Sequence, residues 1–241
     1  MRFGNLALLL CIALIAASQT PITISSGANG TARPIAALIG KMRRSDGLRV
    51  TYEDPRYGRR SDMDTRPFAF SYGPEDLGTP DGIQATIARM LTEYGASGGV
   101  TFRVIKDGTR LNIVPAETGA ATAQRVNQDS VLETNITIPS AQRDGLQLLR
   151  AICDEVRRQT GYAIGIGPSA PVNSLARFHT AEGIEAQTAR AALEHLLDGI
   201  MPPGSEVWDL YYDPADRGYG LNFAYLGPAG AKHGSQARTQ P

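Results

Sequence analysis

The chain is poor in the side chains on which most catalytic and metal sites depend. Its 241 residues include three histidines, two cysteines and one tryptophan. His179, Glu182 and Glu185 have a spacing that would suit metal ligands on a helix, but Gly183 weakens such a helix and no further histidine is near. The pattern is more typical of a solvated loop, and no G-x-S-x-G elbow marks a hydrolase. We therefore expect no catalytic residues, no metal and no cofactor.

The chain also lacks an excess of one charge and a long hydrophobic run. Its 24 Lys and Arg balance 24 Asp and Glu, so no basic field exists to recruit nucleic acid or an anionic membrane. The apolar run at residues 6–17 is too short to cross a bilayer. Because Arg2 precedes this run and small residues end it, we interpret residues 1–18 as a signal peptide. The mature protein is then periplasmic or secreted, with no membrane span after cleavage.

Loss of the signal peptide leaves a single cysteine. Cys11 lies inside the cleaved segment, so Cys153 has no partner for an internal disulfide, although an exported protein would permit one. Cys153 lies on the apolar stripe of a predicted helix, which favours a buried hydrophobic role over a nucleophilic one. In a lipoprotein Cys11 would instead carry the lipid, but Leu10 stands where a lipobox has a small residue.

Instead of catalytic motifs, the chain has a regular order of helix and strand patterns. In residues 30–115 a helix stripe ends at Gly47, two alternating strands follow, a second helix begins after Thr79 and ends at Gly95, and a hairpin turns at Gly108. The two helix stripes consist of Ile35, Leu38, Ile39 and Met42, and of Ile83, Ile87, Met90, Leu91 and Tyr94. The strands alternate over residues 48–52 and 68–72.

Residues 131–226 repeat this order. A short strand at Ile136 leads into a helix that Ser140 can cap and that ends at Gly161, and strand 162–166 follows. A looser second strand is expected around Leu175 and Phe178. The next helix is capped by Thr188 and stops around Gly199, and the last hairpin alternates at Trp208, Leu210 and Tyr212 and at Leu221, Phe223 and Tyr225.

The match between the halves predicts an α+β fold of two small repeated domains. Each domain would contain two helices packed on short antiparallel or mixed sheets. Residues 116–130, which are small and polar, are predicted to form the linker between them, and residues 227–241 a disordered tail.

Three segments of the second half carry a family pattern. These are Ile136-Thr137-Ile138-Pro139-Ser140, residues 146–161 (LQLLRAICDEVRRQTG) and residues 189–199 (ARAALEHLLDG). They resemble the secretin and TonB short N-terminal domain, over about residues 132–226, whereas the first half matches by pattern alone. The resemblance implies non-catalytic periplasmic α+β domains that dock to other proteins of secretion, transport or signalling systems.

We therefore expect an exported docking or adaptor protein whose partner is another envelope protein. The first half has a longer loop than the second, and its mixed charges make it the candidate docking surface. The residues concerned are Arg56, Tyr57, Arg59, Arg60 and Arg66.

Two other function classes stay open. A secreted hydrolase with a site between the halves would need polar groups such as His179, Glu182 and Asp198 in one pocket. A small-ligand or glycan binder would instead use aromatic residues of the last hairpin, among them Trp208 and Tyr225, although alternation places about half of these in the core.

Overall fold

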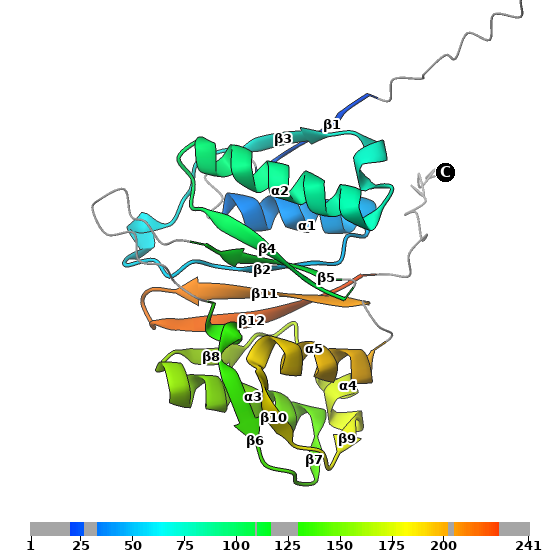
Figure 1. The fold of residues 1–241 in the computed structure, drawn as a ribbon. Helices are drawn as coiled ribbons and strands as arrows, with labels where there is room; N and C mark the ends of the chain where they lie inside the picture. Colours follow the sequence, from blue (N-terminus) through cyan, green and yellow to red (C-terminus); the bar gives the residue numbers. More distant parts are fainter. Residues whose placement is uncertain (1–19, 27–32, 109, 117–129, 202–204, 227–241) are drawn as a thin grey trace, which may run out of the picture.

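The structure, a computed structural model, describes residues 20–26, 33–108, 110–116, 130–201 and 205–226. These residues form a mixed α+β fold, as predicted, in which a six-stranded sheet lies between two helical layers (Figure 1). The predicted signal peptide, the predicted tail and all of the predicted linker except its two end residues lie outside the described residues.

The first half supplies the upper helical layer in Figure 1. Its elements are β1 (Ile22–Ser25), α1 (Pro34–Asp46), β2 (Val50–Glu53), η1 (Arg60–Asp62), β3 (Ala69–Tyr72), η2 (Pro74–Leu77), α2 (Pro80–Ala96), β4 (Phe102–Asp107) and β5 (Arg110–Pro115).

The second half supplies the lower layer. Its elements are η3 (Val131–Glu133), β6 (Asn135–Ile138), β7 (Arg143–Asp144), α3 (Gly145–Thr160), β8 (Ala163–Ile166), α4 (Val172–Arg177), β9 (His179–Thr180), β10 (Ile184–Thr188), α5 (Ala189–Ile200), β11 (Glu206–Asp213) and β12 (Gly218–Tyr225). Among the described helices, none combines the length and apolar character that a bilayer span requires.

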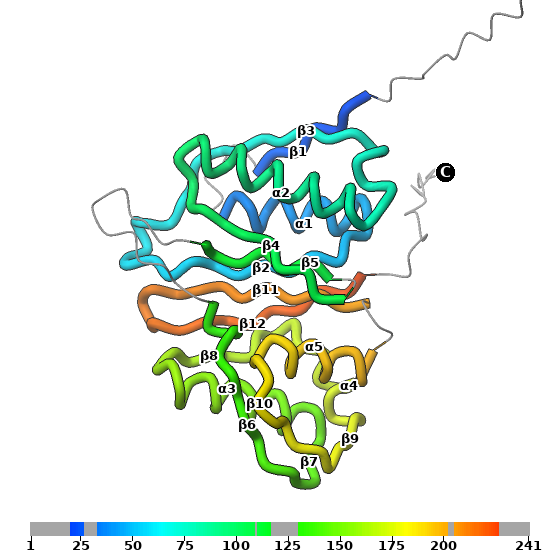
Figure 2. Tube along the Cα trace, in the orientation of Figure 1, coloured from blue at the N-terminus to red at the C-terminus, as the bar shows by residue number. Residues whose placement is uncertain are grey.

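Both halves build the central sheet, whose strand order is β4-β5-β2-β11-β12-β8. In each half an antiparallel hairpin, β4–β5 or β11–β12, takes the strand that follows the first helix as a parallel neighbour. Strands β2 and β11 then pair in parallel, so segments far apart in the sequence lie side by side (Figure 2). The six strands thus form one sheet instead of a separate sheet in each half. The origin of the halves by duplication stays a prediction.

The predicted helix ends are confirmed at two of the four glycines. Gly47 and Gly161 follow α1 and α3 with φ of 67° and 78°, a left-handed conformation that glycine adopts without steric cost. Gly95 and Gly199 instead lie inside α2 and α5, each of which continues one residue further. Both helices end within one residue of the prediction, but neither glycine takes the left-handed conformation, which glycine permits and does not require.

Two further predictions in the second half are wrong. The segment with Leu175 forms helix α4 instead of a strand, since a short apolar pattern does not distinguish the two. Helix α3 begins after Asp144, not Ser140: the Asp144 carboxylate accepts from the Gln147 amide at 2.7 Å, and the Gln147 side chain accepts from the Asp144 amide at 2.9 Å. Thr79 and Thr188 cap α2 and α5 as predicted.

The two faces of the sheet belong to two hydrophobic cores. The upper core packs α1 and α2 on apolar residues of β2, β4 and β5, and the lower core packs α3 and α5 on apolar residues of β8, β11 and β12. Neighbouring strand residues point to opposite faces. Tyr52 of β2 therefore points up while Glu53 points down, and Leu210 of β11 points down while Asp209 points up. Polar side chains are thus buried where the halves meet.

Candidate functional site

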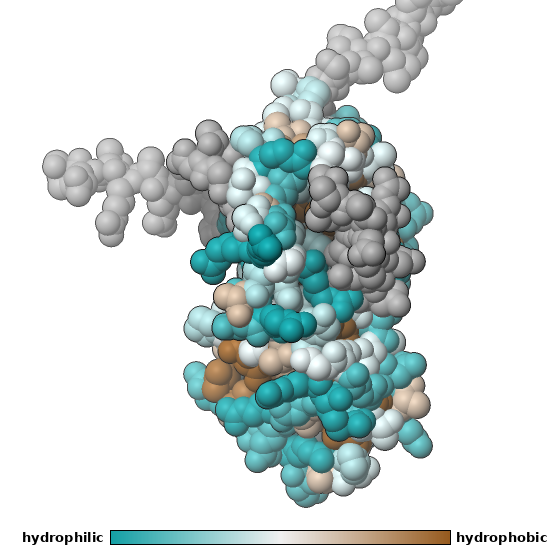
Figure 3. Space-filling view, turned by 90° about the vertical axis from the view of Figure 1, so that its left-hand side faces the viewer, coloured by the Kyte–Doolittle hydropathy of each residue, from teal (hydrophilic) through white to brown (hydrophobic). Residues whose placement is uncertain are grey.

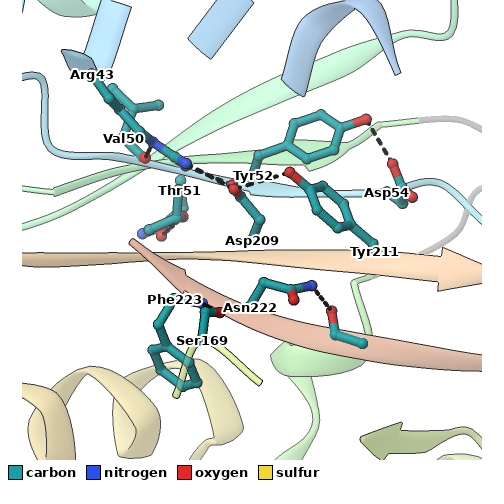
Figure 4. A network of polar contacts seen from close by, with 12 residues as sticks. Arg43, Val50, Thr51, Tyr52, Asp54, Ser169, Asp209, Tyr211, Asn222 and Phe223 are labelled. Carbon is teal, nitrogen blue, oxygen red and sulfur yellow. Dashed lines mark hydrogen bonds and ion pairs between the residues drawn. The ribbon is translucent and has the colours of Figure 1, made fainter. Parts of the chain in front are cut away.

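A buried ion pair joins the halves on the upper face of the sheet (Figure 4). Arg43 of α1 reaches across to β11, where its terminal nitrogens donate to the Asp209 carboxylate at 2.8 and 2.6 Å. Its Nε donates to the Val50 carbonyl at 2.7 Å, and the Tyr211 hydroxyl donates to Asp209 at 3.1 Å. Because a two-pronged guanidinium–carboxylate pair tolerates little displacement, this contact fixes β11 against β2.

Asp54, just after β2, makes a second contact between the halves. Its carboxylate accepts from the Tyr52 hydroxyl at 2.9 Å and from the Tyr212 amide at 3.0 Å. Arg33 forms an ion pair with Asp54 and donates to the Tyr212 carbonyl at 3.0 Å. Burial raises the pKa of Asp54 to about 6, although the Arg33 guanidinium opposes this shift.

The lower face has its own buried ion pair beneath β2. Glu53 lies 2.5 Å from Arg190 of α5 and accepts a hydrogen bond from Ser130. Arg190 also donates to Glu133 at 3.0 Å, and its guanidinium lies 5.6 Å from the centre of the Trp208 ring. Helix α5 of the second half is thereby anchored to a strand of the first.

Helix α5 extends these contacts to β5. Both terminal nitrogens of Arg110 donate to the Asp198 carboxylate, one of them at 3.0 Å. Glu194 of α5 is also buried. Its burial, and to a smaller extent the negative charge of the nearby Asp107, raises the pKa of its carboxyl to about 7, whereas Arg110 opposes this shift. The buried charges described so far therefore hold the halves together.

The predicted docking loop folds back onto the protein. Tyr57 is buried in the lower core, and the Arg56 guanidinium lies 4.9 Å from the centre of the Tyr162 ring. Tyr57 is consequently inaccessible to a partner.

The other three arginines of this loop are exposed. Arg66 is held by the Asp64 carboxylate at 2.6 Å, and Arg60 lies 3.8 Å from Asp213, whereas Arg59 points away from the core. Docking through this loop stays a prediction, and it now rests on Arg59 and Arg60.

An apolar groove opens between α3 and β8 on the lower side of the sheet. Its volume is about 500 Å³, and residues lining it include Leu146, Cys153, Ile164, Ile166 and Val172. Val172 is 47% exposed and is one of two large hydrophobic residues exposed among those described. Figure 3 shows hydrophobic side chains reaching the surface in the lower part of the molecule, the part that contains α3, α5 and β8. The charged side chains of Arg150 and Asp154 line the same groove.

The groove runs beside an edge strand. In the sheet β8 pairs with β12 and ends the strand order. The Gly167 amide donates to the Leu221 carbonyl of β12 at 2.7 Å, and successive residues of a strand point their amides to opposite sides. The backbone groups of Ile164 and Ile166 therefore face outward. On this outer side no strand among the described residues pairs with β8. Such an edge beside an apolar groove can accept an extended peptide as an added strand.

On its upper face this edge strand and its neighbour carry glycine in place of larger side chains. Gly165 of β8 and Gly220 of β12 lie opposite one another, and a Cβ atom on either would meet no atom closer than 3.7 Å. The alternation of glycine over residues 161–167 predicts either a close backbone approach or a thin sheet face. Both occur: Gly165 is exposed, and a Cβ atom on Gly167 would lie 2.8 Å from the Leu221 carbonyl oxygen. No feature of the sequence indicates, however, that β8 is an edge strand, and the sequence analysis does not predict the groove.

The residues of the two alternative functions do not meet at this groove. His179 lies on β9 opposite Asp144, whereas Asp198 is paired with Arg110 beneath β5. No group of three His, Cys, Asp or Glu side chains able to share a metal ion occurs in the described part of the chain. Burial raises the pKa of the Cys153 thiol to about 12, so the thiol is neutral and a poor nucleophile.

The aromatic residues of the last hairpin are divided between core and surface. Trp208, Tyr212 and Tyr219 are buried in the lower core, whereas Tyr225 is 61% exposed. They do not form one exposed platform.

Comparisons with known proteins return no relative. No family model, no curated protein and no solved structure matches the chain. The resemblance to the secretin and TonB short N-terminal domain therefore stays an expectation from the sequence.

The Arg43–Asp209 pair gives a stability prediction. Arg43→Met leaves the Asp209 carboxylate buried without its partner and is expected to lower the free energy of unfolding by about 3–5 kcal/mol. Arg43→Met combined with Asp209→Leu, which removes both charges, should recover most of this loss. Urea unfolding followed by circular dichroism measures both effects. A double variant as unstable as the single one would contradict the assignment.

Glu194 gives a pH prediction. Its pKa is about 7 in the folded protein against an ordinary value of 4.5, so the folded state holds this proton more tightly than the unfolded chain. The resulting stability is fully present below pH 4.5 and is lost as the pH rises to about 7. Urea unfolding between pH 5 and pH 8 should show a smaller decline for Glu194→Gln than for the unmodified protein. Glu185→Gln, at an exposed carboxylate, is the matched control, and an unchanged slope in Glu194→Gln would refute the assignment.

Proposed function

We propose that this protein is a non-catalytic docking protein of the cell envelope that binds a partner chain as an added strand on β8. The observation that supports it is the free β8 edge beside the groove of Cys153, Ile166 and Val172. The envelope location rests on the predicted signal peptide of residues 1–18.

The geometry explains how such binding would be selective. A strand laid along β8 would pair with the outward backbone groups of Ile164 and Ile166, which gives affinity for any extended peptide. Every second side chain of that strand would point toward the groove, where burying one aliphatic side chain contributes roughly 1.5–3 kcal/mol. The preferred partner segment is therefore extended, with apolar residues alternating along one face.

The β2 edge, which β11 occupies, shows how a strand lies on an edge of this kind. In the first half β2 holds the position that β8 holds in the second, and β11 lies along it as a parallel strand. The Asp209 and Tyr211 side chains of this strand point toward α1, as the side chains of a bound strand would point toward α3. The fold thus already contains one strand added to an edge of this kind.

A displayed library of random octapeptides tests the proposal. Selection on the full mature chain should enrich peptides with alternating apolar residues, and Val172→Asp should weaken their binding at least tenfold, measured by fluorescence anisotropy. Tyr225→Asp, at the other exposed large hydrophobic residue, is the matched control and should bind normally. Failure to enrich any peptide, or equal loss in both variants, would overturn the proposal.

A further inference from the structure

We propose that the strand received by β8 is β4 of a second copy of this chain, so that copies join head to tail and extend the sheet. This inference rests on the proposed function, strand addition at β8, and names its partner. It follows from the way in which the two halves of one chain are already joined.

The internal join between the halves leaves one complementary edge free at each end of the sheet. Strand β4 has the same place in the first hairpin as β11 has in the second, and β8 has the same place beside its hairpin as β2. The β2–β11 contact therefore joins the strand that follows a first helix to the first strand of a hairpin. The two strands that end the sheet, β8 and β4, are again one strand of each of these two types.

Strand direction and helix placement agree with this join. Strands β2, β5 and β11 run in one direction, and β4, β12 and β8 run in the other, so β4 of a second copy would lie parallel to β8 as β11 lies parallel to β2. From one half to the next, both the strand direction and the face that carries the helices reverse (Figure 1). Two reversals restore the original orientation, and the second copy therefore continues the sheet without inversion.

The register of the internal join identifies the residues that would meet. Tyr52 and Ile166 each lie five residues after the glycine that ends the preceding helix, and they pair with Ile113 and Leu221. The last pairs of the two hairpins are Asp107–Arg110 and Asp213–Gly218. Ile113 and Leu221 each lie three residues after the second member of these pairs, so they are counterparts. The same count makes Arg103 the counterpart of Asp209 and Ile105 the counterpart of Tyr211. Since Asp209 lies opposite Tyr52, Arg103 would lie opposite Ile166.

The side chains at these positions would meet one acidic group and the apolar end of the groove. Arg103 of β4 is exposed and would face α3, where the exposed carboxylate of Asp154 lies at the groove. Ile105, two residues along, would point toward the apolar end of the groove near Leu146 and Val172. In the internal join Arg43 lies on the helix and Asp209 on the strand. The α3 residue that matches Arg43, counted from the glycine after each helix, is Arg157, so the acid that would meet Arg103 is Asp154, one turn earlier and beside Arg150.

The helix layers supply a second, independent fit. Inside the chain, α5 covers the lower face of β2 and β5 through Arg190 and Asp198. The corresponding upper face of β8 and β12 carries Gly165 and Gly220, at which an added Cβ atom would meet no atom closer than 3.7 Å. The apolar stripes of α2 and α5 make α2 the counterpart of α5. In a second copy α2 would therefore approach this glycine surface.

The side of α2 that would make this approach is small and uncharged. The counterparts of Glu194 and Asp198, four residues apart on α5, are Ala88 and Thr92 on α2, both exposed. Small residues on both surfaces allow a helix to approach a sheet closely. Inside one chain, charged side chains fill the space between α5 and the sheet. Between two chains, α2 would instead lie close to the sheet and leave little space to fill.

A head-to-tail contact does not use the same surface on both partners, so it does not stop at a dimer. With strands about 4.8 Å apart, six strands advance each copy by about 29 Å along the sheet. The twist of the sheet decides whether the series closes into a ring or grows as a filament.

Charge reversal tests the contact. The unmodified mature chain should show a mass that grows with concentration in sedimentation equilibrium. Arg103→Asp blocks the β4 edge and Asp154→Arg blocks the β8 edge, and each should weaken self-association at least tenfold. An equimolar mixture of the two variants should regain self-association, because every contact between unlike variants places one acidic and one basic side chain at these two positions. The double variant should regain self-association, since its two charges are complementary again.

Arg44→Asp and Asp216→Arg are matched controls, because both residues are exposed and lie on neither surface. A chain that stays monomeric at all concentrations, or assembles regardless of Arg103 and Asp154, would overturn the inference. A monomeric chain that still binds octapeptides at the groove would leave the proposed function standing, whereas loss of both would remove the two together.

Discussion

The parallel pairing of β2 with β11 is the contact on which the rest of the structure depends. It merges two three-stranded sheets into one and places the helices of the halves on opposite faces. Because of this placement, each half covers part of the other half's strands with charged side chains, among them Arg43 and Arg190. The junction is therefore held by ion pairs and hydrogen bonds that demand a particular geometry, whereas the apolar cores lie to either side.

The local elements follow from the sequence because their signals are local. The stripe of Ile35, Leu38, Ile39 and Met42 became the buried side of α1, and the alternation at Trp208 and Leu210 became β11. Caps at Thr79 and Thr188 were also predictable, since a hydroxyl before an apolar stripe satisfies an amide of the first turn. Where local signals are ambiguous, as around Leu175, the choice between helix and strand depended on packing.

The candidate site was not predictable in the same way. That β8 ends the sheet is a property of all six strands together, and no pattern within residues 163–166 distinguishes an edge strand from a central one. The charges of Glu53 and Asp209 show the same limit. Alternation alone would leave them on the solvated face of their strands. The other half brings a helix over that face, so Glu53 is buried and the Asp209 side chain is only 14% exposed. Sequence periodicity reports one face of one strand, whereas burial depends on what the second half places there.

The distance along the chain between the joined strands has a kinetic consequence. Arg43 and Asp209 are 166 residues apart, so β2 gains its neighbour after nearly the whole chain has emerged. Contacts of such long range slow folding, and until they form the edge of β2 and its buried charges are exposed to other chains. The last hairpin then acts as the closing step of folding, and a chain truncated before it would leave the aggregation-prone edge open.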